Sequence, residues 1–315
     1  MYDKVKLWID RAVVGETFPT IANYLDKANT QVNHQTGEVK TFGNIEGLKV
    51  SIYANGLSLV GSLPKYLYGG SNVYPLNRHT TVHAIEKIED ALHIHIGESF
   101  VTEMEFGTNF LMKHSVKEYL AKLGDMPRLT RCHLEASTLY YKGVGRRQPK
   151  VFAFYDKIAD ATAKGMEYPE DMKGKNLLRY EMRYKGRLHK QLRVPEVTAS
   201  TLTDESFYRM MVKHYQDTYF SISKQKQIKT NSMNEIKTVS DAVYVFMARL
   251  INQCDQTQIG GFLEELKEAG VFADRKYYSR LKKKLQEVAN KADITVSDEL
   301  IKELDDEIKN CGAYV

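Results

Sequence analysis

The pattern of apolar and polar residues predicts strands along the first part of the chain. The segment KVKLWID (4–10) has the pattern of a first strand, and FPTIANYLDKA (18–28) after it has helical spacing. GEVKTFGNI (37–45), LKVSIYANG (48–56) and LSLVGSL (57–63) are short, rich in β-branched residues and punctuated by Asn-Gly and Gly. Such segments are typical of antiparallel strands.

From residue 80 the spacing changes from that of strands to that of a helix. Apolar residues recur at steps of three and four, which is one face of a helix, at Val82, Ile85, Ile88, Leu92 and Ile96. Gly97 stands where a helix would end. The next segment, FVTEMEFGTNF (100–110), alternates again, so it is predicted to be a strand.

The segments that follow alternate between helices and strands up to Pro195. A helix, SVKEYLAKLG (115–124), leads to MPRLTRCHLEASTLYYKG (126–143) and the turn-rich VGRRQPK (144–150), and two strands follow, KVFAFYDK (150–157) and NLLRYEMRYKG (176–186). Strands separated by helices and hairpins indicate an α+β fold with a mainly antiparallel central sheet flanked by helices.

After Pro195 the apolar pattern is helical throughout. SFYRMMVKHYQDTYF (206–220) precedes a polar, basic connector, and four helix candidates follow, at 239–254, 257–270, 274–290 and 296–310. We therefore expect an α+β domain at 1–221, a basic linker at 222–237 and a helical C-terminal domain at 238–315. No internal repeat is found.

Composition narrows the class of protein. Of the 315 residues 43% are hydrophobic and 27% charged, as in a globular protein with a core, and no apolar run reaches the roughly 18 residues that span a bilayer. With no signal-like N-terminus, we expect a cytoplasmic protein without a membrane segment. Three widely spaced cysteines predict neither a disulfide framework nor a zinc knuckle. Between residues 113 and 193 there are 19 Lys and Arg against 9 Asp and Glu, which favours a polyanionic partner.

Two pairs of polar residues near residue 100 have the spacing of possible metal ligands. His93 and His95 lie two apart on the predicted helix, so their side chains diverge by about 200° and do not converge on one ion. We expect them at the surface or at the end of the helix. Glu103 and Glu105 instead share one face of a predicted strand.

Strand alternation collects further polar side chains. His133 pairs with Glu135, Tyr155 with Lys157, and Glu181 lies between two arginines; the members of this polar face are His133, Glu135, Tyr155, Lys157, Arg179, Glu181 and Arg183. If these strands are neighbours, carboxylates and a histidine are suited to bind Mg²⁺ or Mn²⁺. A tyrosine is suited to attack phosphorus, and a lysine to stabilise the phenolate or the phosphate. On spacing alone, a packed tyrosine and an ion-pair ladder are the commoner explanations of the pattern.

The order of these segments resembles that of a known family. GSLPKYLYGGSNVYPL, a helix, VTEMEFGTNF, HLEASTLYYKG, KVFAFYDK and LLRYEMRYKGRL follow one another as in the gene II/gene X replication initiators of filamentous phages and their plasmid relatives. The resemblance extends from about Gly56 to Pro195.

The resemblance implies a metal-dependent rolling-circle initiator. Such proteins nick one strand at the origin through a tyrosine, keep the 5′ phosphate and leave a 3′ hydroxyl. The family's nucleophile matches Tyr155, with Lys157 as its partner, and its arginine–aromatic–glutamate strand matches Arg179, Tyr180 and Glu181. Its acidic strand, Arg–apolar–Asp, is replaced here by Glu103, Met104 and Glu105, and Glu135 falls at a further acidic position.

We thus expect a sequence-specific DNA nicking and rejoining endonuclease that uses Mg²⁺ or Mn²⁺. Glu105 and Glu135 are the expected metal ligands, with Glu181, His133 and Glu103 as further candidates. The expected DNA contacts are Arg146, Arg147, Lys150, Arg179, Arg183, Lys185 and Arg187. Partners implied by analogy are single-stranded or supercoiled origin DNA and the host helicase and polymerase. Alternatives are a relaxase or transposase with the same tyrosine chemistry and a non-cleaving DNA-binding regulator.

Overall fold

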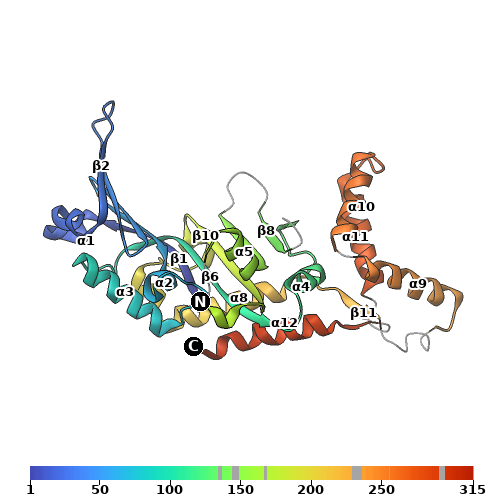
Figure 1. The fold of residues 1–315 in the computed structure, drawn as a ribbon. Coiled ribbons are helices and arrows are strands. Elements are labelled where there is room, and N and C mark those ends of the chain that lie inside the picture. The colour runs from blue at the N-terminus through green and yellow to red at the C-terminus, as the bar shows by residue number, and fades with distance from the viewer. Residues whose placement is uncertain are drawn as a thin grey trace.

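The computed structural model describes residues 1–133, 137–143, 149–166, 169–228, 236–254, 256–290 and 295–314. Its main feature is a ten-stranded antiparallel sheet with the strand order β2-β3-β4-β5-β1-β6-β10-β9-β8-β7 (Figure 1). The strands are β1 (Tyr2–Asp10), β2 (Asp26–Val32), β3 (Val39–Ile45), β4 (Leu48–Tyr53), β5 (Gly56–Ser62), β6 (Phe100–Met112), β7 (Thr130–His133), β8 (Thr138–Lys142), β9 (Lys150–Asp156) and β10 (Asn176–Lys185). The predicted α+β class with an antiparallel sheet is confirmed.

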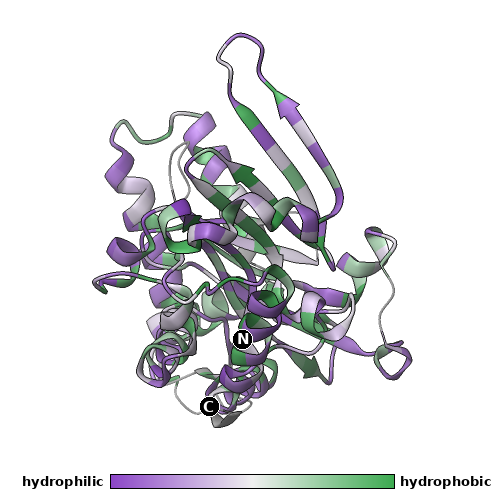
Figure 2. Ribbon diagram, turned by 90° about the vertical axis from the view of Figure 1, so that its left-hand side faces the viewer, coloured by the Kyte–Doolittle hydropathy of each residue, from purple (hydrophilic) through white to green (hydrophobic). Residues whose placement is uncertain are grey.

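Tight turns set the register of the first strands. β3 and β4 are joined by Glu46 and Gly47, which both have positive φ, as a two-residue hairpin turn requires. Ala54 and Asn55 form the turn between β4 and β5, and Gly56, the second residue of the Asn-Gly pair, is already the first residue of β5, where it pairs with Tyr53. The hairpin of β2 and β3 projects beyond the rest of the molecule, while hydrophobic residues concentrate in the strands of the sheet (Figure 2).

The helix predicted over 18–28 is wrong in type and in length. A short helix α1 (Arg11–Val14) is followed by a 3₁₀ helix, η1 (Gly15–Tyr24), and strand β2 begins at Asp26. Pro19 lies inside η1 and has no N–H to donate, which disfavours a regular α-helix there.

The helix α3 (Arg78–Leu92) ends five residues before Gly97. His93 caps it in the left-handed conformation, with φ of 54°, and its N–H donates to the carbonyl of Glu89. The ring of His93 packs 4.7 Å from that of Tyr24, and the side chain of His95 is 99% exposed. Both histidines therefore lie after the last residue of the helix, at its end and at the surface as expected. Their side chains point apart because His93 packs on Tyr24 and His95 faces solvent, and not because of the helical geometry assumed from the sequence.

One face of the sheet is covered by an aromatic core. The long helix α8 (Glu205–Phe220) packs Tyr215 against Tyr180 of β10, and the ring of Tyr180 stacks on Phe154 of β9 at 4.2 Å. The shorter helices are α2 (Leu63–Tyr68), α4 (Val116–Lys122), α5 (Lys157–Ala163), α6 (Leu188–Leu192), α7 (Ala199–Thr203) and η2 (Glu170–Met172). Because side chains alternate along a strand, the residues next to these aromatic ones point to the opposite face of the sheet, and these residues are mainly polar.

The four C-terminal helix candidates are confirmed. They are α9 (Val239–Gln253), α10 (Gln256–Glu268), α11 (Arg275–Ala289) and α12 (Glu299–Asn310), and η4 (Cys311–Tyr314) follows. The strands β11 (Lys226–Ile228) and β12 (Thr295–Ser297) form a separate pair. No helix in these described ranges is long and apolar enough to cross a bilayer.

The C-terminal helices pack in two places. α12 buries Ile301, Leu304 and Ile308 in the main core of the sheet, whereas α9 and α11 share a small cluster of Val245, Ala248 and Val288. α9, α10 and α11 lie at the end of the molecule opposite the β2–β3 hairpin (Figure 1). The domain boundaries at 222 and 238 stay predictions.

Gly107, in the middle of β6, lies in close contact with the backbone of β10, and the arrangement of the polar face depends on this contact. A Cβ at this position would lie 2.4 Å from the carbonyl oxygen of Tyr180 and 2.7 Å from the Cα of Glu181. We expect Gly107→Ala to lower the free energy of unfolding by about 3 kcal/mol, because only backbone movement relieves the clash. Chemical denaturation measures this change.

Gly260→Ala is the matched control for this substitution. Gly260 lies in α10 with open space where a Cβ would project, so alanine is expected to leave stability unchanged or raise it by up to about 1 kcal/mol. Equal stability of Gly107→Ala and the wild type would contradict the packing of β6 against β10.

Candidate active site

Three adjacent strands bring polar side chains together on the face of the sheet opposite α8. In the register of β6 and β10, Glu105 lies across from Arg183 and Gly107 across from Glu181. In the register of β10 and β9, Arg179 lies across from Tyr155. The strands predicted from alternation are thus neighbours, and their polar positions share one face.

Arg179 is the centre of this face. Its side chain is 1% exposed, and its guanidinium donates to Glu181 Oε2 at 2.5 Å, to Asp3 Oδ2 at 2.5 Å and to Asn109 Oδ1 at 3.1 Å. A buried guanidinium is stable only when it is paired and hydrogen-bonded. The expectation that Arg179 contacts DNA is therefore wrong, because its side chain is buried and held by internal acceptors.

Glu181 is held by two arginines. Arg183 donates through Nε to Glu181 Oε1 at 2.5 Å and forms an ion pair with the same oxygen through Nη2, while Arg179 holds the other oxygen. Burial alone would raise the pKa of Glu181, but Arg179 and Arg183 outweigh it and lower this pKa to about 2. Glu181 is therefore held as a carboxylate at neutral pH.

Asp3 is a member of the site that the sequence did not reveal. The pairing of β1 with β6 shifts register between Tyr2 and Val5, and bulges of this kind re-aim a side chain. Its carboxylate accepts hydrogen bonds from Ser62 and, at 2.8 Å, from Asn72. The predicted strand begins at Lys4, so no alternation argument includes Asp3 in the polar face.

Among the described residues, Asp3, Glu105 and Glu181 form a cluster, hereafter the acidic cluster. Each offers an oxygen atom, and these atoms lie within 4.8 Å of one another. Burial, followed by repulsion from Glu181 and Asp3, raises the pKa of Glu105 to about 7. Three carboxylates are the hard oxygen donors that Mg²⁺ and Mn²⁺ prefer, and a divalent cation would relieve this repulsion, so the donor set fits such an ion.

Glu103 lies on the same strand but outside the acidic cluster. Its carboxylate pairs with Lys6 at 3.8 Å and with Lys185 at 3.9 Å, near the surface. Of the two glutamates of β6, Glu105 is therefore the one beside Glu181 and Asp3.

Tyr155 points its hydroxyl at the acidic cluster. The side chain is 8% exposed, and its Oη donates to Glu181 Oε2 at 3.2 Å. Burial raises the pKa of Tyr155 well above its ordinary value, and Arg179 offsets this only in part. The phenol is thus held in place as a neutral donor in this state.

Lys157 is not the last residue of a strand, as alternation predicted. β9 ends at Asp156, whose carboxylate accepts from the N–H groups of Ile158 and Ala159 and so begins α5 at Lys157. The lysine is nevertheless buried near the same charges. Burial, with a further contribution from Arg179, lowers the pKa of its ammonium to about 8.

The neighbouring tyrosines are engaged elsewhere. Tyr141 donates to the carbonyl of Gly124 at 2.7 Å, and Tyr180 lies in the aromatic core on the other face of the sheet. Tyr140 is half-buried, with the guanidinium of Arg183 5.8 Å from the centre of its ring.

The remaining candidates lie at the rim of the site or outside the described residues. Arg183 is half-exposed, Lys185 and Arg187 are exposed, and Lys150 extends over the ring of Phe152 at 5.8 Å. Glu135, Arg146, Arg147 and the side chain of His133 fall outside the described residues, so their predicted roles stay predictions.

The chain matches the model of a known protein family. The model of a family described as the N-terminal part of a phage replication-associated protein, the gene II protein, matches residues 1–219, which include all ten strands of the large sheet and the acidic cluster. No curated protein matches the chain.

The raised pKa of Glu105 predicts how stability depends on pH without metal. The pKa of Glu105 is about 7 in the folded protein and 4.5 in the unfolded chain. Between pH 4.5 and pH 7 the folded state therefore binds more protons than the unfolded chain. The free energy of unfolding therefore falls as pH rises from about 4.5 to 7, by on the order of 2 kcal/mol. We expect Glu105→Gln to lose this slope in denaturation experiments with EDTA present.

Mn²⁺ should raise the melting temperature of the wild type at pH 8 and not that of Glu105→Gln. Glu103→Gln is the control, two residues along the strand, and should keep both the slope and the Mn²⁺ response. If stability depends on pH in the same way in the wild type and in Glu105→Gln, the repulsion of Glu105 by Glu181 and Asp3 is contradicted.

Proposed function

Since the chain belongs to the gene II family of filamentous-phage replication initiators, we propose that it nicks and rejoins one strand of origin DNA through Tyr155. The observation that supports this most is the hydrogen bond from the phenol of Tyr155 to Glu181, a carboxylate of the acidic cluster. It holds a hydroxyl nucleophile beside the groups that suit a phosphate-bound cation.

In the proposed reaction Tyr155 Oη attacks the scissile phosphorus. The bond from phosphorus to the 3′ oxygen breaks, the 5′ phosphate stays on the tyrosine, and the strand ends in a 3′ hydroxyl that a polymerase can extend. Because the phosphotyrosine keeps the energy of the broken bond, attack by a 3′ hydroxyl rejoins the strand without ATP. The reaction is metal-dependent phosphoryl transfer with a covalent intermediate.

Lys157 is our proposed carrier of the proton. With a pKa of about 8 it is partly neutral near physiological pH, so its amine can accept the phenolic proton and then protonate the leaving 3′ oxygen. An ordinary exposed lysine would stay charged and would serve this role poorly.

Asp3, Glu105 and Glu181 would hold the cation, which supplies Lewis-acid stabilisation of the charge on the phosphate when it is bound. Arg183 is half-exposed at the edge of the acidic cluster, and its proposed role is to bind a non-bridging oxygen of the phosphate. Arg179 has a different part, since it positions Glu181 and Asp3 from beneath.

The proposed substrate is single-stranded or supercoiled origin DNA. Lys150, Lys185 and Arg187 lie near the ends of β9 and β10 and are proposed to contact the flanking backbone, together with Arg146 and Arg147, which precede β9 in the sequence. A host helicase and polymerase are the partners that such a reaction requires once the strand is open.

Tyr155→Phe should abolish the covalent protein–DNA adduct. We expect a loss of at least about 1,000-fold in nicking of single-stranded origin DNA with Mn²⁺, because the variant lacks the nucleophile. The adduct is measured on a denaturing gel. Tyr140→Phe, which removes a hydroxyl from the neighbouring strand, is the control and should nick at a rate close to that of the wild type.

An adduct retained by Tyr155→Phe would show that another residue attacks. The absence of any adduct from the wild type on every candidate origin would favour the non-cleaving regulator.

The rate of nicking should depend on pH through Lys157. We expect the single-turnover rate of the wild type to rise with pH and to level off above about pH 8, as the neutral amine becomes the major form. Lys157→Met should be slower by about 100-fold and should lose this rise. Lys150→Met, at the other end of β9, should weaken DNA binding and keep the rise. The same pH profile in Lys157→Met as in the wild type would rule out the proton-carrying role.

A further inference from the structure

We propose that α10 and α11 form a helix-turn-helix that binds double-stranded DNA, with α11 in the major groove. This second DNA site lies outside the polar face that carries Tyr155, and it does not depend on the nicking chemistry. Four features of the described residues support it: the charge of α11, the arrangement of its faces, the structure of the turn before it and its attachment to the rest of the protein.

The first half of α11 is strongly basic. Among the ten residues 275–284 there are six cations and no acid, and the cations are Arg275, Lys276, Arg280, Lys282, Lys283 and Lys284. Some of these make ion pairs on their own helix or at its cap, such as Lys276 with Asp274 at 2.7 Å and Lys283 with Glu287 at 3.9 Å. Because exposed ion pairs are weak, they do not prevent these side chains from turning to a phosphate.

Three of these cations share one face of α11 that is turned to solvent. Tyr278 and Val288 are buried against the neighbouring helices, while Lys276, Arg280 and Lys283, spaced by four and three residues, are exposed. Residues with this spacing share one face of a helix. Ser279 is exposed beside them, so the face offers charges for phosphates and a hydroxyl for base edges.

An exposed aromatic residue completes this face. Tyr277 is 44% exposed, and the cations of Lys276 and Arg280 lie 5.4 and 5.5 Å from the centre of its ring. Aromatic side chains interleaved with basic ones are typical of nucleic-acid interfaces. A cationic helix is also of the width that the major groove admits.

The turn between the helices is ordered by Tyr278. Its hydroxyl accepts from the N–H of Phe272 at 2.9 Å, and the carbonyl oxygens of Leu266 and Phe272 each lie 3.1 Å from it. Gly270, with φ of 63°, lies just after α10, and Asp274 caps α11 by accepting from Lys276 N. The turn, residues 269–274, is longer than the three or four residues typical of a helix-turn-helix. It shares with that motif a glycine and a fixed start of a basic second helix, the helix that reads the major groove in such proteins.

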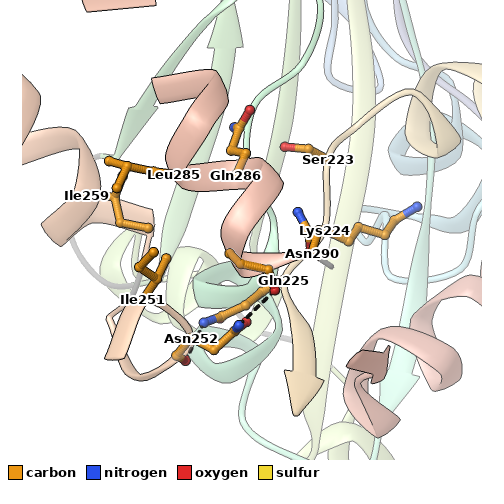
Figure 3. Close-up of a pocket in the computed structure, with 10 residues that line it drawn as sticks. Ser223, Lys224, Gln225, Ile251, Asn252, Ile259, Leu285, Gln286 and Asn290 are labelled. Carbon is orange, nitrogen blue, oxygen red and sulfur yellow. Dashed lines mark hydrogen bonds between the residues drawn. The ribbon is translucent and has the colours of Figure 1, made fainter. Parts of the chain in front are cut away.

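α11 is attached to the α+β part of the chain. Asp125, between α4 and β7, pairs with Lys282 at 2.6 Å and accepts from Gln286 at 3.1 Å. In the same region Gln225 donates to the carbonyl of Asn252 at 2.6 Å, and the cavity between the connector at 223–225, α9, α10 and α11 is only about 20 Å³ (Figure 3). Duplex bound to α11 is therefore held in a defined position relative to the sheet.

The test compares duplex and single-stranded DNA of equal length and mixed sequence. In the full chain, the triple variant Lys276→Gln/Arg280→Gln/Lys283→Gln should bind a fluorescent 24-base-pair duplex at least about 30-fold more weakly near 0.1 M salt, and the salt dependence should fall by about three counterions. Binding of the single strand should change by less than about threefold.

The matched control removes three exposed lysines from α8 and α12. Lys213→Gln/Lys302→Gln/Lys309→Gln loses the same charge, and binding of the duplex should fall by less than about threefold. Equal losses in the two triple variants would show a general charge effect and overturn the proposal. Equal losses for duplex and single strand would make α11 a single-strand surface and would also overturn it. Melting temperatures of both variants verify that they fold.

A duplex selected from a random pool by the wild-type protein tests two further points. These are whether α11 binds in the major groove and whether duplex binding is independent of nicking. Binding should protect guanine N7 in that duplex from dimethyl sulfate, because N7 lies in the major groove. No selected sequence, or no protection, would overturn the groove assignment. Tyr155→Phe should bind the duplex as the wild type does, and the α11 triple variant should still form the covalent adduct on a single strand. Failure of nicking and failure of duplex binding are thereby distinguished.

Discussion

The buried guanidinium of Arg179 is the constraint on which the arrangement of this protein depends. A charge removed from water needs partners with good geometry, and leaving one unpaired costs several kcal/mol. Here the partners come from three strands: Asp3 from β1, Asn109 from β6, and Glu181 from β10, the strand of Arg179 itself. The same contacts aim the carboxylates at one another, so the pairing of Arg179 and the assembly of the acidic cluster are one structural event.

The two faces of the sheet have different roles: one packs into the hydrophobic core and the other carries the acidic cluster. On one face, Tyr180 and Phe154 stack under α8 and supply the apolar burial that stabilises the fold. On the other, the residues next to them in sequence, Glu181 and Tyr155, are turned toward the acidic cluster. A change of one residue in register would exchange the two faces, which is why the close contact at Gly107 and the strand pairing around it matter for function as well as for stability.

Much of this arrangement follows from the sequence, because β6, β9 and β10 are regular over their length. Alternation places Glu105, Tyr155 and Glu181 on a common face once these strands are neighbours, as the structure shows them to be. Alternation does not predict bulges, so it misses Asp3, and it does not distinguish a buried cation from an exposed one, so it assigns Arg179 to DNA. The helix over 18–28 failed because Pro19 and the chain's return into β2 override helical spacing. The proposed ligands Glu135 and His133 stay untested, since their side chains lie outside the described residues.

Identification of the residue that carries the DNA is the most direct test of the account. Trypsin cleaves after Lys150 and Lys157, which leaves the peptide VFAFYDK with Tyr155 as its one tyrosine. Mass spectrometry of the trapped adduct, after digestion with trypsin and nuclease, should find the nucleotide phosphate on this peptide. Phosphate on the peptide of residues 132–142, which carries Tyr140 and Tyr141, would contradict the assignment of the nucleophile and with it the role of the acidic cluster.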